Sequence, residues 1–161
     1  MKTFTAPWSG LLIGVSVFGT ALCLGVAAAN LVHTGGRIGT PVDFLIVVAL
    51  PALLVGGCAL FTVRGYGVAP DAILIRRLFW FTRLPREGLQ SVAYEPGAMS
   101  GSIRTFGNGG LFSFTGWYRN RALGNYRAFV TDGRRTVVLR YTRRTIVVSP
   151  GEPEEFVKSL E

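Results

Sequence analysis

The chain has 161 residues and a mass of 17.4 kDa, the size of one domain or of one domain with an anchor. Hydrophobic residues make up 49% and charged residues 16%, against about 25% charged in an average soluble domain, so the composition excludes a disordered chain and argues against an ordinary soluble enzyme. The formal net charge is +8, and 15 of the 17 basic residues are arginines, whose charge is permanent and suited to bidentate contact with anions.

Two apolar stretches without charged residues predict membrane-spanning helices, at residues 11–32 and 44–63. Each has about the 20 residues that cross a bilayer core at 1.5 Å per residue. A pair of buried core helices is the alternative, but a chain of this length has too little remaining structure to cover both on all sides. Pro51 predicts a kink in the second span, and no substrate site follows from it.

A cleaved signal peptide is the alternative for the first stretch. Lys2 supplies a thin positive region, and Ala27, Ala28 and Ala29 form a small-residue pattern of the kind that signal peptidase cleaves. The apolar run is longer than the roughly 7 to 15 residues usual in a signal peptide, which favours a retained helix. Whether the first stretch is cleaved or retained, the second stretch is expected to span the membrane.

The distribution of basic residues predicts the orientation. The loop between the spans carries Arg37 as its one fixed positive charge, whereas 15 of the 17 basic residues follow Val63. The positive-inside rule then places both termini in the cytoplasm, with the chain a multi-pass protein of the cell membrane. Trp8, Arg64 and Tyr66 are the residues expected at the membrane interface, where aromatic and basic side chains gather.

After Gly65 the pattern changes to short strands and turns. Strands are predicted at residues 66–68, 72–81, 89–94, 126–131, 136–141 and 145–149, with hairpin turns at 132–133 and 142–144. A short helix is expected at 153–160, because Pro153 and two glutamates open it favourably. The predicted organisation is a membrane anchor at 1–64 and, at 65–161, a mainly β domain. Its fold class is an antiparallel barrel or orthogonal sandwich with one C-terminal helix.

Several runs in this second part carry a family resemblance. They are ILIRRLFW at 73–80, LPREGLQSV at 84–92, SIRTFGNGGLFSFTGWYRN at 102–120, LGNYRAFVTD at 123–132 and IVVSPGEPEEFV at 146–157. In these runs the chain resembles the bacterial pleckstrin-homology (PH) domain family, in its membrane-anchored forms. The resemblance implies a seven-stranded, barrel-like fold capped by a C-terminal helix. Most members lack an assigned activity, so it implies a fold more than a function.

Residues 97–124 contain seven glycines and invite a phosphate-loop interpretation. A Walker loop needs a lysine, which this segment lacks, and a dinucleotide fingerprint needs glycine where Phe112 stands. Two interpretations remain open. The glycines can serve tight turns with positive φ, or the segment can be a surface that binds a ligand or partner. Whether it folds into the sheet or stands free is also open.

Arginines and aromatic rings alternate in the same segment. Guanidinium groups and glycine amides together can receive an anionic group, although rings in a core with arginines in water would give the same pattern. The candidate ligand or partner surface consists of Arg104, Phe106, Asn108, Gly109, Gly110, Trp117, Arg119 and Arg121.

The predicted domain has no histidine or cysteine, which removes the usual nucleophile–base pairs and the thiolate or imidazole ligands of metal sites. We therefore expect no enzyme activity, no cofactor and no metal. The expected function is a non-enzymatic, membrane-anchored interaction module that binds a protein partner or a second copy of itself at the inner face of the membrane. The alternative is a reader of anionic lipid headgroups or phosphorylated small ligands; no nucleic-acid partner is expected.

Overall fold

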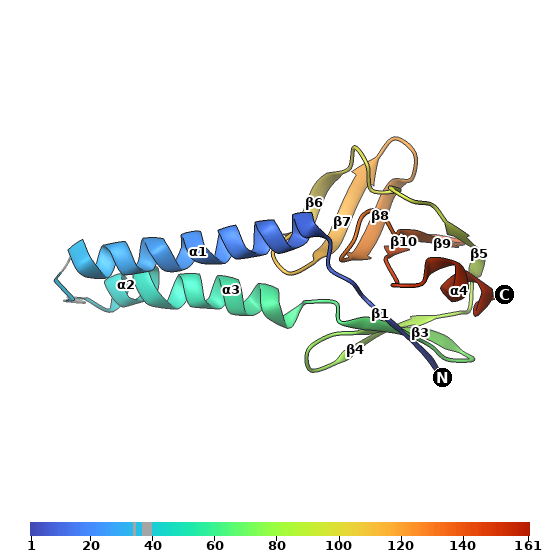
Figure 1. The fold of residues 1–161 in the computed structure, drawn as a ribbon, viewed down its shortest axis with the longest axis horizontal. Coiled ribbons are helices and arrows are strands. Elements are labelled where there is room, and N and C mark those ends of the chain that lie inside the picture. Colours follow the sequence, from blue (N-terminus) through green and yellow to red (C-terminus); the bar gives the residue numbers. More distant parts are fainter. Residues whose placement is uncertain (34, 37–39) are drawn as a thin grey trace.

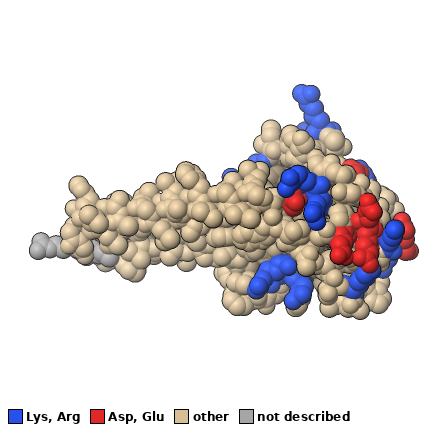
Figure 2. All heavy atoms as spheres, in the orientation of Figure 1, with Lys and Arg blue, Asp and Glu red and all other residues tan. Residues whose placement is uncertain are grey.

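A computed structural model of the chain describes residues 1–33, 35–36 and 40–161. Two long helices lie side by side and project from one end of a β module, and both chain termini lie in that module (Figure 1). The loop cation Arg37 lies outside the described residues. On the face seen in Figure 2, charged side chains gather over the β module, whereas the helical pair is almost entirely free of them.

The helical pair consists of two runs long and apolar enough to cross a membrane. The first is α1 (Gly10–His33), and the second combines α2 (Pro41–Phe44), the π-helical turn η1 (Leu45–Ala49) and α3 (Leu50–Leu60). Almost none of their residues are buried within the protein, unlike those of a core helix. The π-helical turn ends at Ala49, two residues before Pro51, which lacks an N–H and crowds the preceding turn. The kink expected at this proline stays a prediction.

The first sheet has four antiparallel strands in chain order: β1 (Lys2–Thr5), β2 (Gly65–Val68), β3 (Ala72–Arg76) and β4 (Phe81–Pro85). Strand β1 precedes the first apolar helix, and it pairs with β2 from Lys2 opposite Val68 to Thr5 opposite Gly65. The sequence prediction missed this strand and placed all of residues 1–64 in the anchor. The single strand predicted at 72–81 is also wrong, because a turn closed by the Arg77 N–H on the Trp80 carbonyl divides it into β3 and β4.

The second sheet has six strands in the order β5-β9-β10-β8-β7-β6. Their bounds are β5 (Leu89–Tyr94), β6 (Ile103–Gly109), β7 (Phe114–Asn120), β8 (Gly124–Val130), β9 (Val137–Tyr141) and β10 (Thr145–Val148). The turn at 142–144 joins a hairpin as predicted, but the hairpin predicted at Asp132-Gly133 is wrong. Strand β10 inserts between β8 and β9 and pairs parallel with β8, so the strands on either side of that turn are not neighbours.

A hydrophobic core fills the space between the two sheets, and α4 (Pro153–Lys158) closes it as the expected C-terminal helix. Phe156 of α4 is fully buried, with its ring edge-on to Phe4 at 5.2 Å and to Tyr66 at 6.1 Å between centroids. Tyr66, expected at the membrane interface, is therefore a core residue. A second, smaller cluster around Tyr126, Val130 and Tyr118 covers the other face of the six-stranded sheet.

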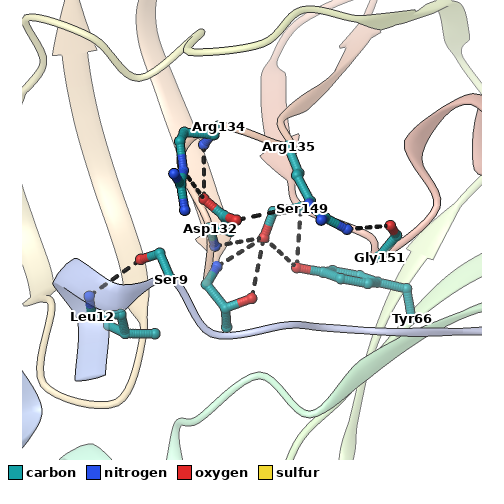
Figure 3. A network of polar contacts seen from close by, with 9 residues as sticks. Ser9, Leu12, Tyr66, Asp132, Arg134, Arg135, Ser149 and Gly151 are labelled. Carbon is teal, nitrogen blue, oxygen red and sulfur yellow. Dashed lines mark hydrogen bonds and ion pairs between the residues drawn. The ribbon is translucent and has the colours of Figure 1, made fainter.

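A buried polar network connects this core to the start of α1 (Figure 3). The hydroxyl of Ser149 accepts hydrogen bonds from the backbone N–H groups of Thr131 (2.8 Å) and Asp132 (3.2 Å). The Tyr66 hydroxyl donates to the Phe129 carbonyl at 2.6 Å and accepts from the Ser149 N–H at 3.1 Å. The Thr131 carbonyl then accepts from the Ser9 N–H at 3.1 Å, immediately before α1. The network therefore fixes the start of α1 on the β module.

The network predicts a loss of stability at high pH. Burial raises the pKa of Tyr66 to about 12, whereas tyrosine in an unfolded chain titrates near about 10. Between these values the unfolded state binds fewer protons than the folded state. The contribution of Tyr66 to the free energy of unfolding is therefore fully present below about pH 10, and it is lost as the pH rises towards 12. This fall is measured by denaturant unfolding of the full chain in detergent. Tyr66→Phe is expected to reduce its slope, and an unchanged slope in this variant would contradict the assignment.

Candidate functional site

The glycine-rich segment folds into the sheet as the β6–β7 hairpin, which settles one question that the sequence left open. Six of its seven glycines have positive φ. Two of them face each other across the hairpin, Gly107 opposite Gly116, where the strands approach closely beside a bulge at Thr105. A Cβ on either glycine would overlap backbone atoms of the other strand. Glycine is therefore required here by backbone proximity.

The tip of the hairpin contacts the first apolar helix. The Ser16 hydroxyl of α1 donates to the Gly110 carbonyl at 3.3 Å and accepts from the Phe112 N–H at 2.8 Å. Phe112 adopts a φ of 66°, which is uncommon for a residue other than glycine. Its ring lies 6.2 Å from that of Trp8, which is 40% exposed. The tip is thus a contact between module and helix.

The end of α3 is joined to the module through the backbone carbonyl of Phe61. It accepts hydrogen bonds from the Arg77 guanidinium and, at 3.4 Å, from the Ser113 hydroxyl. These donors satisfy one of the carbonyl groups that a helix leaves without partners at its C-terminal end. Both apolar helices are consequently held on the module at their near ends, and the joint places Arg77 at the end of the second apolar helix.

A cavity of about 380 Å³ lies beside this joint, between the end of α3 and the six-stranded sheet. The residues that line it are Gly57, Cys58, Phe61, Arg77, Phe106, Gly107, Asn108, Thr115, Gly116, Trp117 and Arg127. Phe106, Asn108 and Trp117 come from the surface predicted in the sequence. The volume falls in the range of small-molecule sites, about 300 to 1,000 Å³.

The other predicted surface residues lie on the hairpin outside this cavity, except Arg121, which follows the end of β7. The Arg104 side chain is exposed and donates to the Gly107 carbonyl at 3.2 Å, where it also covers Gly109. Arg119 and Arg121 are exposed and do not line the cavity. The structure therefore separates the predicted arginines from the predicted rings.

Arg77 is the most buried cation of the cavity, with 6% of its surface exposed. Its Nε donates to the Thr82 hydroxyl at 3.0 Å, and its guanidinium lies 5.4 Å from the Phe61 ring centroid and 5.3 Å from that of Phe129. Burial, with the neighbouring charge of Arg127, lowers the pKa of Arg77 to about 10, so the group stays protonated at neutral pH.

Arg127 supplies a second cation to the cavity. Its guanidinium lies 4.9 Å from the Phe129 centroid and 5.9 Å from the Trp117 centroid, in cation–π geometry. Within the described part of the chain, neither Arg77 nor Arg127 forms an ion pair with a carboxylate. Two like charges that are partly desolvated and lack a carboxylate partner attract an anion, and guanidinium forks match the oxygens of a phosphate group.

The sequence prediction missed both arginines as site residues. Arg77 stands in the segment 73–81, which was predicted as a single strand, and Arg127 occupies a position whose neighbours along the same strand face, Phe129 and Asn125, differ in polarity. The available signal was an arginine close to large apolar residues, Leu78 for Arg77 and Phe129 for Arg127. Of the predicted interface residues, Arg64 and Trp8 are exposed near the ends of the helices.

The two-sheet module with its closing helix defines a class of small β domains, and the family model of the bacterial PH domain matches residues 64–161. The chain belongs to this family. Strand β1 lies outside the matched residues although it completes the first sheet. Comparison with the curated proteins found no match, and comparison with the solved structures also found none.

Proposed function

We propose that this chain is a non-enzymatic, membrane-anchored PH module that binds the phosphate of an anionic phospholipid headgroup between Arg77 and Arg127. The observation that carries this proposal is the presence of two guanidinium groups, without a carboxylate partner among the described residues, in a cavity at the end of the second apolar helix. A lipid phosphate lies at this depth when the helix spans the bilayer. Of the two functions that the sequence left open, the cavity favours the reader of an anionic ligand.

The proposed topology is a retained helical hairpin with the module at the cytoplasmic face. The excess of basic residues after Val63 supports this side of the membrane. Because β1 pairs with β2, the segment before the first helix lies on the same side as the module. Signal cleavage near Ala29 would remove Phe4 from the core and Ser16 from the hairpin tip, which supports retention of the first helix.

The proposal is tested by native mass spectrometry of the full chain in neutral detergent, with phosphatidylglycerol and phosphatidylcholine as probes. We expect retention of phosphatidylglycerol in preference to phosphatidylcholine. Arg127→Gln is expected to lower the affinity for phosphatidylglycerol roughly tenfold, the effect of losing one charge-assisted contact. Arg119→Gln is the matched control, because it removes the same charge from an exposed position on β7.

Three outcomes would contradict the proposal: no preference for the anionic lipid, an equal loss in both variants, or a loss only in Arg119→Gln. A thermal unfolding scan establishes that Arg127→Gln is folded. Competition with inorganic phosphate separates two sources of the ligand. It displaces the lipid if the cavity recognises a phosphate group alone, and it fails to do so if the acyl chains contribute to binding.

A protein partner or a second copy of the chain remains the second candidate. The observation that favours it is the open edge of the six-stranded sheet, where β6 exposes 73% of Ile103 and 77% of Phe106. An unpaired strand edge offers backbone groups to an added strand. Chemical crosslinking of the full chain in membranes tests this candidate.

A further inference from the structure

The turn between β3 and β4 exposes a continuous apolar run. The exposed fractions are 39% for Leu78, 77% for Phe79, 37% for Trp80 and 59% for Phe81. Four consecutive exposed apolar residues are unfavourable in water unless another surface covers them. The turn itself is ordered by the hydrogen bond from the Arg77 N–H to the Trp80 carbonyl at 2.9 Å. The run is therefore a defined surface that the described residues cover only in part.

The position of this turn relative to α3 indicates what covers it. The Trp80 ring packs edge-on against Phe61, the residue after α3, at 5.3 Å between centroids. Leu78 lines an apolar groove of about 790 Å³ together with Leu53, Gly56 and Leu60 of the same helix. Figure 1 shows the β3–β4 turn on the side of the module that faces the helical pair. A bilayer that surrounds α3 to its last turn therefore reaches the turn.

The chemistry of the run matches a membrane interface. Phenylalanine and tryptophan rings partition to the boundary between acyl chains and headgroups. Arg76 and Arg83 flank the run and are exposed, so that cations lie where the headgroups begin. An aqueous protein partner would have to reach these side chains against the lipid that already surrounds the adjoining helix.

We propose that residues 78–81 form a third membrane contact, which inserts into the lipid interface beside the two helices and sets the tilt of the module. This contact is independent of the proposed anion site, because aromatic side chains enter a neutral bilayer as readily as a charged one. With this contact the module is attached to the membrane at three points, the two apolar helices and residues 78–81. The Arg77–Arg127 cavity, which contains the residue preceding the run, is thereby held at the level of the lipid phosphates.

The test is spin-label accessibility in the full chain, reconstituted in nanodiscs of phosphatidylcholine alone. A nitroxide is attached at Phe79→Cys, in a background with Cys23→Ala and Cys58→Ala. The matched control is Glu154→Cys, exposed on α4 at the end of the module remote from the helices (Figure 1). Collision rates with oxygen, which concentrates in lipid, and with a water-soluble nickel complex are compared at both positions.

Insertion is expected to give a ratio of oxygen to nickel collisions several-fold higher at Phe79 than at Glu154. Equal ratios at the two positions would overturn the proposal and leave the turn in water. Since the nanodiscs contain no anionic lipid, the result is independent of the headgroup site. A second variant, Phe79→Ser with Phe81→Ser, is followed through a label at Leu78→Cys. If the two rings hold the turn in lipid, the ratio at this label falls in the double variant, and an unchanged ratio counts against that role.

Discussion

Gly116→Ala is expected to lower the free energy of unfolding by roughly 4 kcal/mol, near the upper end of single-substitution effects. Gly116 has a φ of 144°, a conformation that side-chain-bearing residues rarely adopt. A methyl group here would overlap the Phe106 carbonyl oxygen and the Cα of Gly107, both on the facing strand β6. Relief requires the two strands to separate, and the cavity wall that they form would open with them. The measurement is denaturant unfolding of the full chain in detergent, followed by tryptophan fluorescence.

Gly133→Ala is the matched control for this substitution. Apart from its two chain neighbours, no described residue has an atom within 4 Å of a Cβ placed on Gly133, and the φ of Gly133 is outside the left-handed region. The same chemical change is therefore expected to leave the stability nearly unaltered. If Gly116→Ala changed the free energy of unfolding as little as the control does, β6 and β7 would not approach closely in the folded protein. The cavity wall that these two strands form would then be absent.

Phe4→Ala is expected to destabilise the β module by roughly 3 kcal/mol, the usual cost of emptying a buried phenylalanine site. Phe4 is 6% exposed and packs edge-on against Phe156, although it precedes the first apolar helix by several residues. The substitution leaves both apolar helices unchanged. A loss of stability in the module would therefore show that the N-terminal segment is part of its core. The measurement is the unfolding midpoint of the full chain in detergent.

Phe106→Ala separates this effect from a general loss of aromatic surface, because Phe106 is 77% exposed and its truncation creates no cavity in the core. We expect its midpoint to stay near that of the unchanged chain. A Phe4→Ala midpoint equal to that of Phe106→Ala would mean that β1 is not docked. The module would then consist of the residues matched by the family model alone.

Local pattern was sufficient for much of the architecture. The length and composition of the two apolar runs predicted the helical pair. β-branched runs predicted β9 and β10 within a few residues, and the run at 126–131 did the same for β8. The turn at 142–144 was predicted from the runs on either side of it, and Pro153 marked the start of α4. These features depend on residues close together in the chain. For the same reason the candidate surface was predicted on one continuous segment, and only its rings and Asn108 line the cavity.

What the sequence by itself determined is the class of each segment: two apolar helices, a set of short strands, a closing helix and a positively charged module. Only the tertiary structure decided how these segments combine. Strand β1 is four residues long and its partner strand lies some sixty positions away, so the residue pattern around β1 does not predict it. The insertion of β10 between β8 and β9 likewise follows from long-range pairing. Arg77, which directly follows β3, and Arg127 of β8 both lie beside the Phe129 ring. They come together because the burial of apolar surface stabilises contacts between segments that are distant in the chain.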